Sequence, residues 1–452
     1  MAISFQPAAA VDGKVLPGIK VAAIIAAVSL LPILLLSLLG WHYADALHGR
    51  IPFELTNFDA TAAMLSSVLP GSSHGDSWLP MMHALDVLHG PGRNTLYEKL
   101  FFGAHVRFQY PPTALLPLHL LSTIGLLSVR VLNAVNSLIF LCNAAATGFL
   151  AWRLFRPSPA SQAFPARSAM AVLAATAAFL FYPLVRAHLL GQIQLWIDFL
   201  FTMAMLCWLL ERRLAAGLMI GLACTIKPQM GALLLWGLLW REKKFTAGIL
   251  AALVPLLLLS LFLYGIHNHI AYLDILQFLS RHGEGYFANN SVNGILNWYL
   301  SPGDSLRWYD DSFTPFDPIV YAGTLAASLL AIILLAAPPL LDRKRRATLC
   351  DLGAGTICTD IGSPVAWEHH YGVLLPLYLV ALRSILTMPA GTQRLTASVV
   401  VTLSWIFVAN FIPLTSLLAQ GWAAAAQAYC FFGALLLLGF FLTRTEILRT
   451  AS

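Results

Sequence analysis

Polar residues that could do chemistry are few in this chain, and each lies beside a long apolar run. Asp59 lies in the segment that follows the first of these runs. A carboxylate in such a place can take a proton from an attacking hydroxyl group. Most single aspartates in loops only cap a turn or a helix, so the residue alone supports both interpretations.

Lys227 is a charged residue at the junction of two apolar segments, in the sequence Ala-Cys-Thr-Ile-Lys-Pro-Gln. A charge inside a membrane span costs at least about 2.5 kcal/mol and usually faces a cavity or a partner. Pro228 breaks the helix there and frees backbone groups. A lysine beside a broken helix suits an anionic ligand, although a lysine at an ordinary span end can also extend to the membrane surface.

A second polar group opens another apolar run at Gly191 and Gln192, shortly after Arg186 and His188. Glycine permits close approach of backbone or ligand, and the amide of Gln192 offers both donor and acceptor atoms. These residues suit a ligand at the membrane surface. A hydrogen bond between two helices is an equally good explanation.

His369 and His370 follow Trp367 and Glu368 and precede Tyr371. Adjacent helical residues point about 100° apart, whereas two histidines on one helix that bind a metal prefer a spacing of four. We therefore expect a histidine here to contact phosphate or sugar and not a metal. The two aromatic residues also fit an anchor at the membrane interface.

Two further polar groups lie in the segments between apolar runs. Arg107 precedes a Tyr-Pro-Pro sequence. Proline is favoured at the first position of a helix, so a helix is expected to start at these prolines. Asn290 and Asn293 lie in a cluster of amide side chains, which can bind carbohydrate through donors and acceptors.

Composition places these residues in a membrane protein. Apolar residues make up 58% of the 452 residues and charged residues only 11%, whereas a soluble domain carries about 25% charged residues. The net charge of +6 is explained by basic cytoplasmic loops, and we do not expect nucleic-acid binding. The six cysteines form no Cys-x-x-Cys pair, which argues against a disulfide framework and a zinc site.

Apolar runs and basic clusters together predict about twelve transmembrane helices, with both termini in the cytoplasm. The first run is expected to be a retained span and not a removed signal peptide. The spans are expected near residues 20–40, 131–152, 168–185, 191–210, 213–226, 228–240, 245–265, 318–337, 347–362, 369–384, 395–413 and 424–443.

Four segments fit this predicted arrangement of transmembrane helices less well. Residues 112–127 are apolar enough to span, but a span there would put the next arginine cluster outside, so we expect a re-entrant or juxtamembrane helix. Residues 213–226, 228–240 and 347–362 are short. We expect them to be tilted, broken or only partly spanning.

Two long loops, residues 41–111 and 266–317, are left on the outer side. They hold most of the acidic residues, whereas the cytoplasmic loops are short and basic. We therefore expect a multi-pass protein of the bacterial inner membrane whose chemistry faces the periplasm or the cell exterior.

Taken in order, these motifs resemble those of glycosyltransferase family 87, which has the membrane-embedded type C fold. The family includes the polyprenol-phosphate-mannose-dependent mannosyltransferases. The resemblance runs from about residue 20 to about residue 440, so residues 1–452 are expected to form one transmembrane domain. The motifs are an outer-loop aspartate, Tyr-Pro-Pro, Gly-Gln-x-Gln, Lys-Pro, Asn-x-Ser-x-x-Gly and Ser-Pro-x-x-Trp-x-His-His.

The resemblance implies that a sugar, with mannose the family's usual one, moves from a polyprenyl-phosphate carrier to a hydroxyl group of a lipid or glycan, with inversion. Asp59 takes the position of the general base. Cations hold the leaving phosphate, and the resemblance implies neither a metal nor a cofactor. The residues expected to bind the donor phosphate or sugar are His370, His369, Lys227, Arg186, Arg107, Gln192, Asn290 and Asn293.

Two other functions stay open at this point: a transporter or flippase of lipid-linked sugars, and a polymerase or ligase with a diphosphate-linked donor. A transporter would carry charges near mid-membrane and have paired halves, whereas polar residues here gather at one face. Asp351 and Asp360 depart from the pattern, because both lie in the short predicted span 347–362. Either they line a cavity or the segment does not span.

Overall fold

The structure is a computed structural model, and the part of the chain described below is residues 19–48, 56–67, 75–155, 163–301, 303–309 and 312–443. The two chain ends, which we expect in the cytoplasm, lie outside these residues. Within them the regular structure is helical, apart from an isolated bridge between Asn289 and Trp367. The predicted all-α fold is therefore confirmed.

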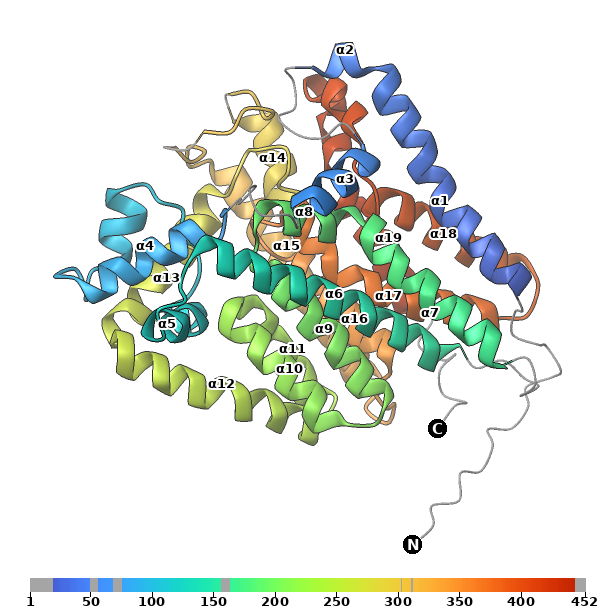
Figure 1. The fold of residues 1–452 in the computed structure, drawn as a ribbon, viewed down its shortest axis with the longest axis horizontal. Coiled ribbons are helices and arrows are strands. Elements are labelled where there is room, and N and C mark those ends of the chain that lie inside the picture. Colours follow the sequence, from blue (N-terminus) through green and yellow to red (C-terminus); the bar gives the residue numbers. More distant parts are fainter. Residues whose placement is uncertain are drawn as a thin grey trace, which may run out of the picture.

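Six helices in the described part of the chain are long and apolar enough to cross a membrane. They include α1 (Ile19–His42), α6 (Val129–Leu154), α12 (Lys243–Tyr264), α15 (Pro318–Leu341), the continuous pair η5 (Glu368–Val373) and α17 (Leu374–Thr387), and the continuous pair η7 (Gly421–Ala428) and α19 (Tyr429–Thr443). Figure 1 shows α1 along one edge of the molecule beside α18 and α12 along the opposite edge.

A bent pair of helices adds a seventh span if the pair is counted as one, and the remaining apolar helices are short. Helices α7 (Ala163–Leu180) and α8 (Tyr182–Leu190) meet at an angle of 50°. The shorter helices are α9 (Gln194–Leu209), α10 (Arg213–Ile226), η4 (Pro228–Gly231) with α11 (Ala232–Leu239), α16 (Leu349–Ile361) and α18 (Thr392–Val408). Every predicted span therefore coincides with helix.

The segments that we expected to be irregular spans are short helices. With 14 residues, α10 is about 21 Å long, less than the roughly 30 Å of the hydrocarbon core. Residues 112–127 form η2 (Pro112–Leu115) and α5 (Leu116–Thr123). The eight residues of α5 extend only about 12 Å, which agrees with a re-entrant or juxtamembrane helix.

The two long segments between spans also contain helices. The first contains α2 (Ala44–Leu47), α3 (Asn57–Ser67), α4 (Trp78–His89) and η1 (Glu98–Gly103), and the second contains α13 (Ile266–His282) and α14 (Val292–Leu300). Figure 1 shows α3 lying over α8, and α14 close to the upper end of α15.

Small residues let α10 and α12 pack backbone to backbone. A Cβ on Gly217 or Gly221 of α10 would overlap the backbone of Phe245 or Ile249, and a Cβ on Gly248 of α12 would overlap the backbone of α10. Lipid does not drive helices together by the hydrophobic effect, so close packing of this kind stabilises the pair.

Several helix breaks meet in the middle of the fold. The α8–α9 break contains Gly191 in the left-handed conformation, with φ of 67°, and the α10–η4 break lies at Lys227. Helix α9 contacts α8, α10 and η5, and α16 contacts η4, η5 and α9. These contacts bring together segments that lie far apart in the sequence, and most of the candidate chemistry lies on them.

Candidate functional site

Asp59 lies in the first turn of α3, where its carboxylate is held by neighbours on two sides. The hydroxyl of Thr56 donates to Oδ2 at 2.8 Å, and the Asp59 backbone N–H donates to that hydroxyl at 3.0 Å. The indole N–H of Trp41 also donates to Oδ2, at 3.2 Å. The carboxylate remains partly exposed, so an acceptor hydroxyl group can reach it.

A buried asparagine fixes the position of this helix. The side chain of Asn57 donates to the carbonyl of Ala409 at 3.0 Å and accepts from the backbone N–H of Phe411 at 2.7 Å. It also donates to the carbonyl of Leu180 at the bend between α7 and α8. Asn57 therefore ties α3 to two distant segments, a role that the sequence did not reveal.

Helix α3 packs on α8, which carries Arg186, and α8 packs in turn on η5. Arg186 is buried and lies close enough to Glu368 and His369 to interact with them electrostatically. The Glu368 carboxylate accepts a hydrogen bond from the hydroxyl of Tyr429 at 2.6 Å. Glu368 was not among the predicted site residues, although it lies in the same short motif as the histidines.

His369 and His370 are both buried in η5, and their rings are nearly perpendicular, with an angle of 89° and centroids 4.8 Å apart. The backbone N–H of Trp367 donates to Nδ1 of His370 at 3.3 Å. Among the described residues, no hydrogen bond to the ring of His369 is present. Both rings therefore keep nitrogen atoms that can bind a ligand.

Partly buried Lys227 begins a chain of polar groups that continues along α9 through buried Gln194 and Asp198. Its ammonium group donates to Oε1 of Gln194 at 2.7 Å, and Nε2 of Gln194 donates to Oδ1 of Asp198 at 2.8 Å. Asp360, at the end of α16, also interacts electrostatically with Lys227. A phosphate bound at Lys227 must therefore compete with the carboxyl groups of Asp198 and Asp360 for the positive charge of the lysine.

Gln192 binds the protein through both ends of its amide. Oε1 accepts from Ser77 at 2.6 Å and from Tyr110 at 3.4 Å, and Nε2 donates to Asp76. Burial raises the pKa of Tyr110 to about 12, so its hydroxyl group stays protonated and can donate. Gln192 thus joins the α8–α9 break to the segment before α4.

Arg107 lies in a junction between the two long segments. Its guanidinium pairs with Glu284 and donates to the carbonyls of Tyr309 and Ser312 at 2.6 and 2.7 Å. The guanidinium also lies 4.2 Å from the centre of the Trp308 ring. These contacts engage both Nη atoms of the guanidinium, whereas its buried Nε has no hydrogen-bond partner among the described residues.

Asn290 and Asn293 are also fully engaged by the protein. Asn290 accepts from the backbone N–H of Cys430 at 3.0 Å, and Asn293 accepts from that of Glu284 at 3.1 Å. The amide of Asn293 also donates to Thr324 at 3.0 Å. Both side chains are buried and shape the segment that contacts η5.

The predicted site residues therefore divide into two groups. Asp59, Arg186 and the two histidines lie on α3, α8 and η5, which pack in succession, and the charge of Lys227 acts on both histidines. The side chains of Arg107, Gln192, Asn290 and Asn293 are bound by neighbouring residues. In the part of the chain that the structure describes, no cluster of three or more His, Cys, Asp or Glu residues could hold a metal ion.

Comparison with known proteins adds one match. The family model of glycosyltransferase family 87 matches residues 108–359, which is more than half of the chain. The matched region includes Arg186 and Lys227, whereas Asp59 and the two histidines lie outside it. A search of curated proteins found no match. The helical membrane fold and the family match together show that this chain belongs to glycosyltransferase family 87 and is a membrane-embedded glycosyltransferase.

Proposed function

We propose that the protein transfers a sugar, with mannose the first to test, from a polyprenyl-phosphate carrier to a hydroxyl group of a lipid or glycan. The observation that carries this proposal is the packing of α3 on α8 and of α8 on η5. Asp59, a partly exposed carboxylate, lies in α3, and Arg186, a buried cation, lies in α8, on which α3 packs. A hydroxyl acceptor and an anionic leaving group need that combination.

The donor phosphate binds at Arg186 and the adjacent histidines in this proposal. Arginine holds phosphate through a planar fork of N–H groups, and His369 and His370 supply further donors when a ring nitrogen carries a proton. Lys227 adds positive charge from the α10–η4 break. Arg107, Gln192, Asn290 and Asn293 shape the surrounding segments, because their own side chains are engaged by the protein.

The reaction is a single displacement at the anomeric carbon. The acceptor oxygen forms a bond to that carbon while the bond from the carbon to the phosphate oxygen breaks, and the configuration inverts. Asp59 takes the proton of the acceptor hydroxyl group. Polyprenyl phosphate leaves as an anion, so no proton is needed on the leaving oxygen, and nearby cations stabilise its charge.

We also propose that the site faces the periplasm or the exterior of a bacterial inner membrane. The argument is the charge distribution: basic residues gather in the short loops at the opposite ends of the spans, and such loops stay in the cytoplasm. The carrier's lipid tail then lies in the bilayer, while its phosphate reaches the periplasmic or exterior surface of the inner membrane.

Asp59→Asn tests the chemistry directly. Purified full-length protein is incubated with polyprenyl-phosphate-mannose and a lipid acceptor, and transfer and donor binding are measured separately. We expect transfer to fall by about 100-fold or more, since general-base catalysis contributes about 10²- to 10⁴-fold, while donor affinity stays the same. The matched control is Asp45→Asn, which changes an exposed aspartate in the same segment.

Three outcomes would contradict the proposal. Wild-type turnover by Asp59→Asn would show that another group takes the proton. A product that retains the donor's anomeric configuration would exclude a single displacement. Transfer from a diphosphate-linked donor, and not from polyprenyl-phosphate-mannose, would overturn the donor assignment.

A further inference from the structure

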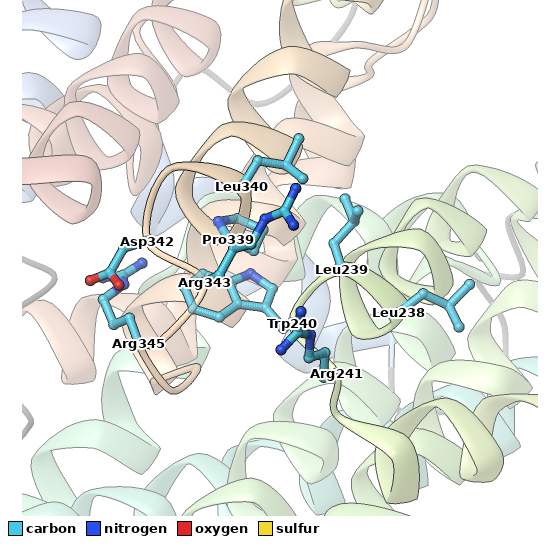
Figure 2. Close-up of a pocket in the computed structure, with 9 residues that line it drawn as sticks. All are labelled: Leu238, Leu239, Trp240, Arg241, Pro339, Leu340, Asp342, Arg343 and Arg345. Carbon is cyan, nitrogen blue, oxygen red and sulfur yellow. The ribbon is translucent and has the colours of Figure 1, made fainter.

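A basic cavity lies beside the ends of α11 and α15, away from the candidate site. Its volume is about 220 Å³, and it is formed where α11 ends and where the chain leaves α15. Figure 2 shows its arginines arranged around Trp240. Its lining residues include Leu238, Trp240, Arg241, Leu340, Asp342, Arg343 and Arg345.

Two buried donors at this cavity have no acceptor. Nη2 of Arg345 donates to Asp351 at 2.6 Å, and the guanidinium lies 4.6 Å from the centre of the Trp240 ring. Nη1 of Arg345 and Nε1 of Trp240 are buried, and neither finds a hydrogen-bond partner among the described residues. A buried donor without a partner costs about 1–3 kcal/mol, so an acceptor that reaches either of these two atoms is stabilised.

The charge of the lining residues selects an anion. Arg241 and Arg343 add two cations to Arg345, and Asp342 is the lining carboxylate within the described part of the chain. Arg241 has a left-handed backbone with φ of 59°, a conformation that costs about 1–2 kcal/mol for a residue other than glycine. A glycine would avoid this cost, whereas arginine puts a cation at the cavity.

The surroundings indicate a lipid ligand. Leu238 and Leu340 line the cavity, and they and the adjacent Leu341 are exposed on apolar helices. Exposed leucines at the end of a span contact acyl chains, while arginines at the same level contact headgroups. We propose that this cavity binds the phosphate group of an anionic phospholipid.

The cavity is separate from the candidate catalytic site. Helix α16 begins beside the cavity, where Asp351 pairs with Arg345, and ends near the site, where Asp360 interacts with Lys227. Nine residues of helix separate these two aspartates by about 13 Å. Lipid binding can therefore be measured without reference to sugar transfer, and its result does not depend on the proposed function.

The test uses full-length protein in detergent and native mass spectrometry. Binding of phosphatidylglycerol is compared with that of phosphatidylcholine with the same acyl chains. The variants are Arg241→Gly, which removes a cation and suits the left-handed backbone, and Arg343→Gln. The matched control is Lys344→Gln, which removes an adjacent exposed cation that does not line the cavity.

We expect phosphatidylglycerol to bind more tightly than phosphatidylcholine to the wild type. Each of the two arginine variants should weaken it about 5-fold, and the double variant about 25-fold, because a cation near the membrane surface contributes about 1 kcal/mol. Lys344→Gln should bind as the wild type does.

Arg345→Lys adds an independent check, since it keeps a cation for Asp351 but removes the planar fork. We expect it to weaken phosphatidylglycerol binding while thermal stability changes little. Equal losses in Lys344→Gln and the arginine variants would show a diffuse charge effect and overturn the site. Binding of inorganic phosphate that phosphatidylglycerol does not displace would overturn the lipid assignment.

Discussion

The indole nitrogen of Trp41 lies 3.2 Å from Oδ2 of Asp59 and joins the end of α1 to the first turn of α3. Asp59 is the proposed general base, and a general base must point its free lone pair at the acceptor hydroxyl group. Trp41 and Thr56 together occupy the carboxylate from two directions. The orientation of the proposed base is thus set by two different elements of the fold.

Replacing Trp41 by phenylalanine should slow transfer without preventing it. The ring is retained, but one of the two side-chain donors to the carboxylate is lost. Because Trp41 is half exposed, the loss should be modest, at about 1 kcal/mol or roughly 5-fold in kcat. Donor affinity should be unchanged. Trp422→Phe, at an exposed tryptophan elsewhere, serves as the control. An unchanged kcat in Trp41→Phe would show that the hydrogen bond from Trp41 to Asp59 does not contribute to transfer.

Lys227 is expected to affect donor affinity more than stability. Lys227→Gln removes a charged donor, and a charged hydrogen bond contributes about 1.5–3 kcal/mol, so donor binding should weaken by about 10-fold or more. Lys227→Arg should restore most of it. Lys99→Gln, at an exposed lysine, controls for general charge loss. If Lys227→Gln lowers the melting temperature but leaves donor affinity intact, the lysine only neutralises Asp198 and Asp360.

Gln192 should behave as a structural residue. Gln192→Leu leaves the buried hydroxyl of Ser77 and the exposed carboxylate of Asp76 without their amide partner, and the loss at a buried group costs about 1–3 kcal/mol. We therefore expect a lower melting temperature in detergent, with donor affinity reduced only in proportion to the folded fraction. Gln420→Leu, at an exposed glutamine, should be neutral. A large loss of donor affinity at full stability would instead place Gln192 in direct contact with the donor.

The pair of Arg107 and Glu284 predicts a pH-dependent stability. Both side chains are nearly buried, at 13% and 10% exposed, so Arg107→Ala should destabilise the protein by about 3–5 kcal/mol. Burial raises the pKa of Glu284, and the charge of Arg107 opposes that rise. Without the arginine, the pKa of Glu284 rises further.

The sign of the effect follows from proton linkage. A carboxyl group whose pKa is raised by folding holds its proton in the folded state at a pH where the unfolded chain has lost it, so folding becomes less favourable as pH rises. The stability deficit of Arg107→Ala should therefore be larger at pH 8 than at pH 5, as measured by thermal unfolding. Adding Glu284→Gln should remove the pH dependence, and a deficit that is equal at both pH values would contradict this account.

The sequence alone was sufficient to predict the helical membrane fold and to identify polar residues at helix breaks. Apolar runs long enough to span are local properties of the chain, and each predicted span coincides with helix. Polar residues at helix breaks, such as Lys227, can also be identified from the sequence, because a charged residue among apolar residues carries a free-energy cost. The order of the motifs was enough to indicate the family that the comparison then confirmed.

Only the tertiary structure decided what each polar side chain contacts. Gln192 and Asn293 have the residue types of ligand-binding groups, yet their amides are engaged by segments far away in the sequence. Asp351 and Asp360 looked alike in one short span, but the first pairs with Arg345 and the second interacts with Lys227 at the other end of α16. Hydrogen bonds and ion pairs act over a few ångströms between elements, so they depend on how the helices pack, and the spacing of residues along one chain does not contain that information.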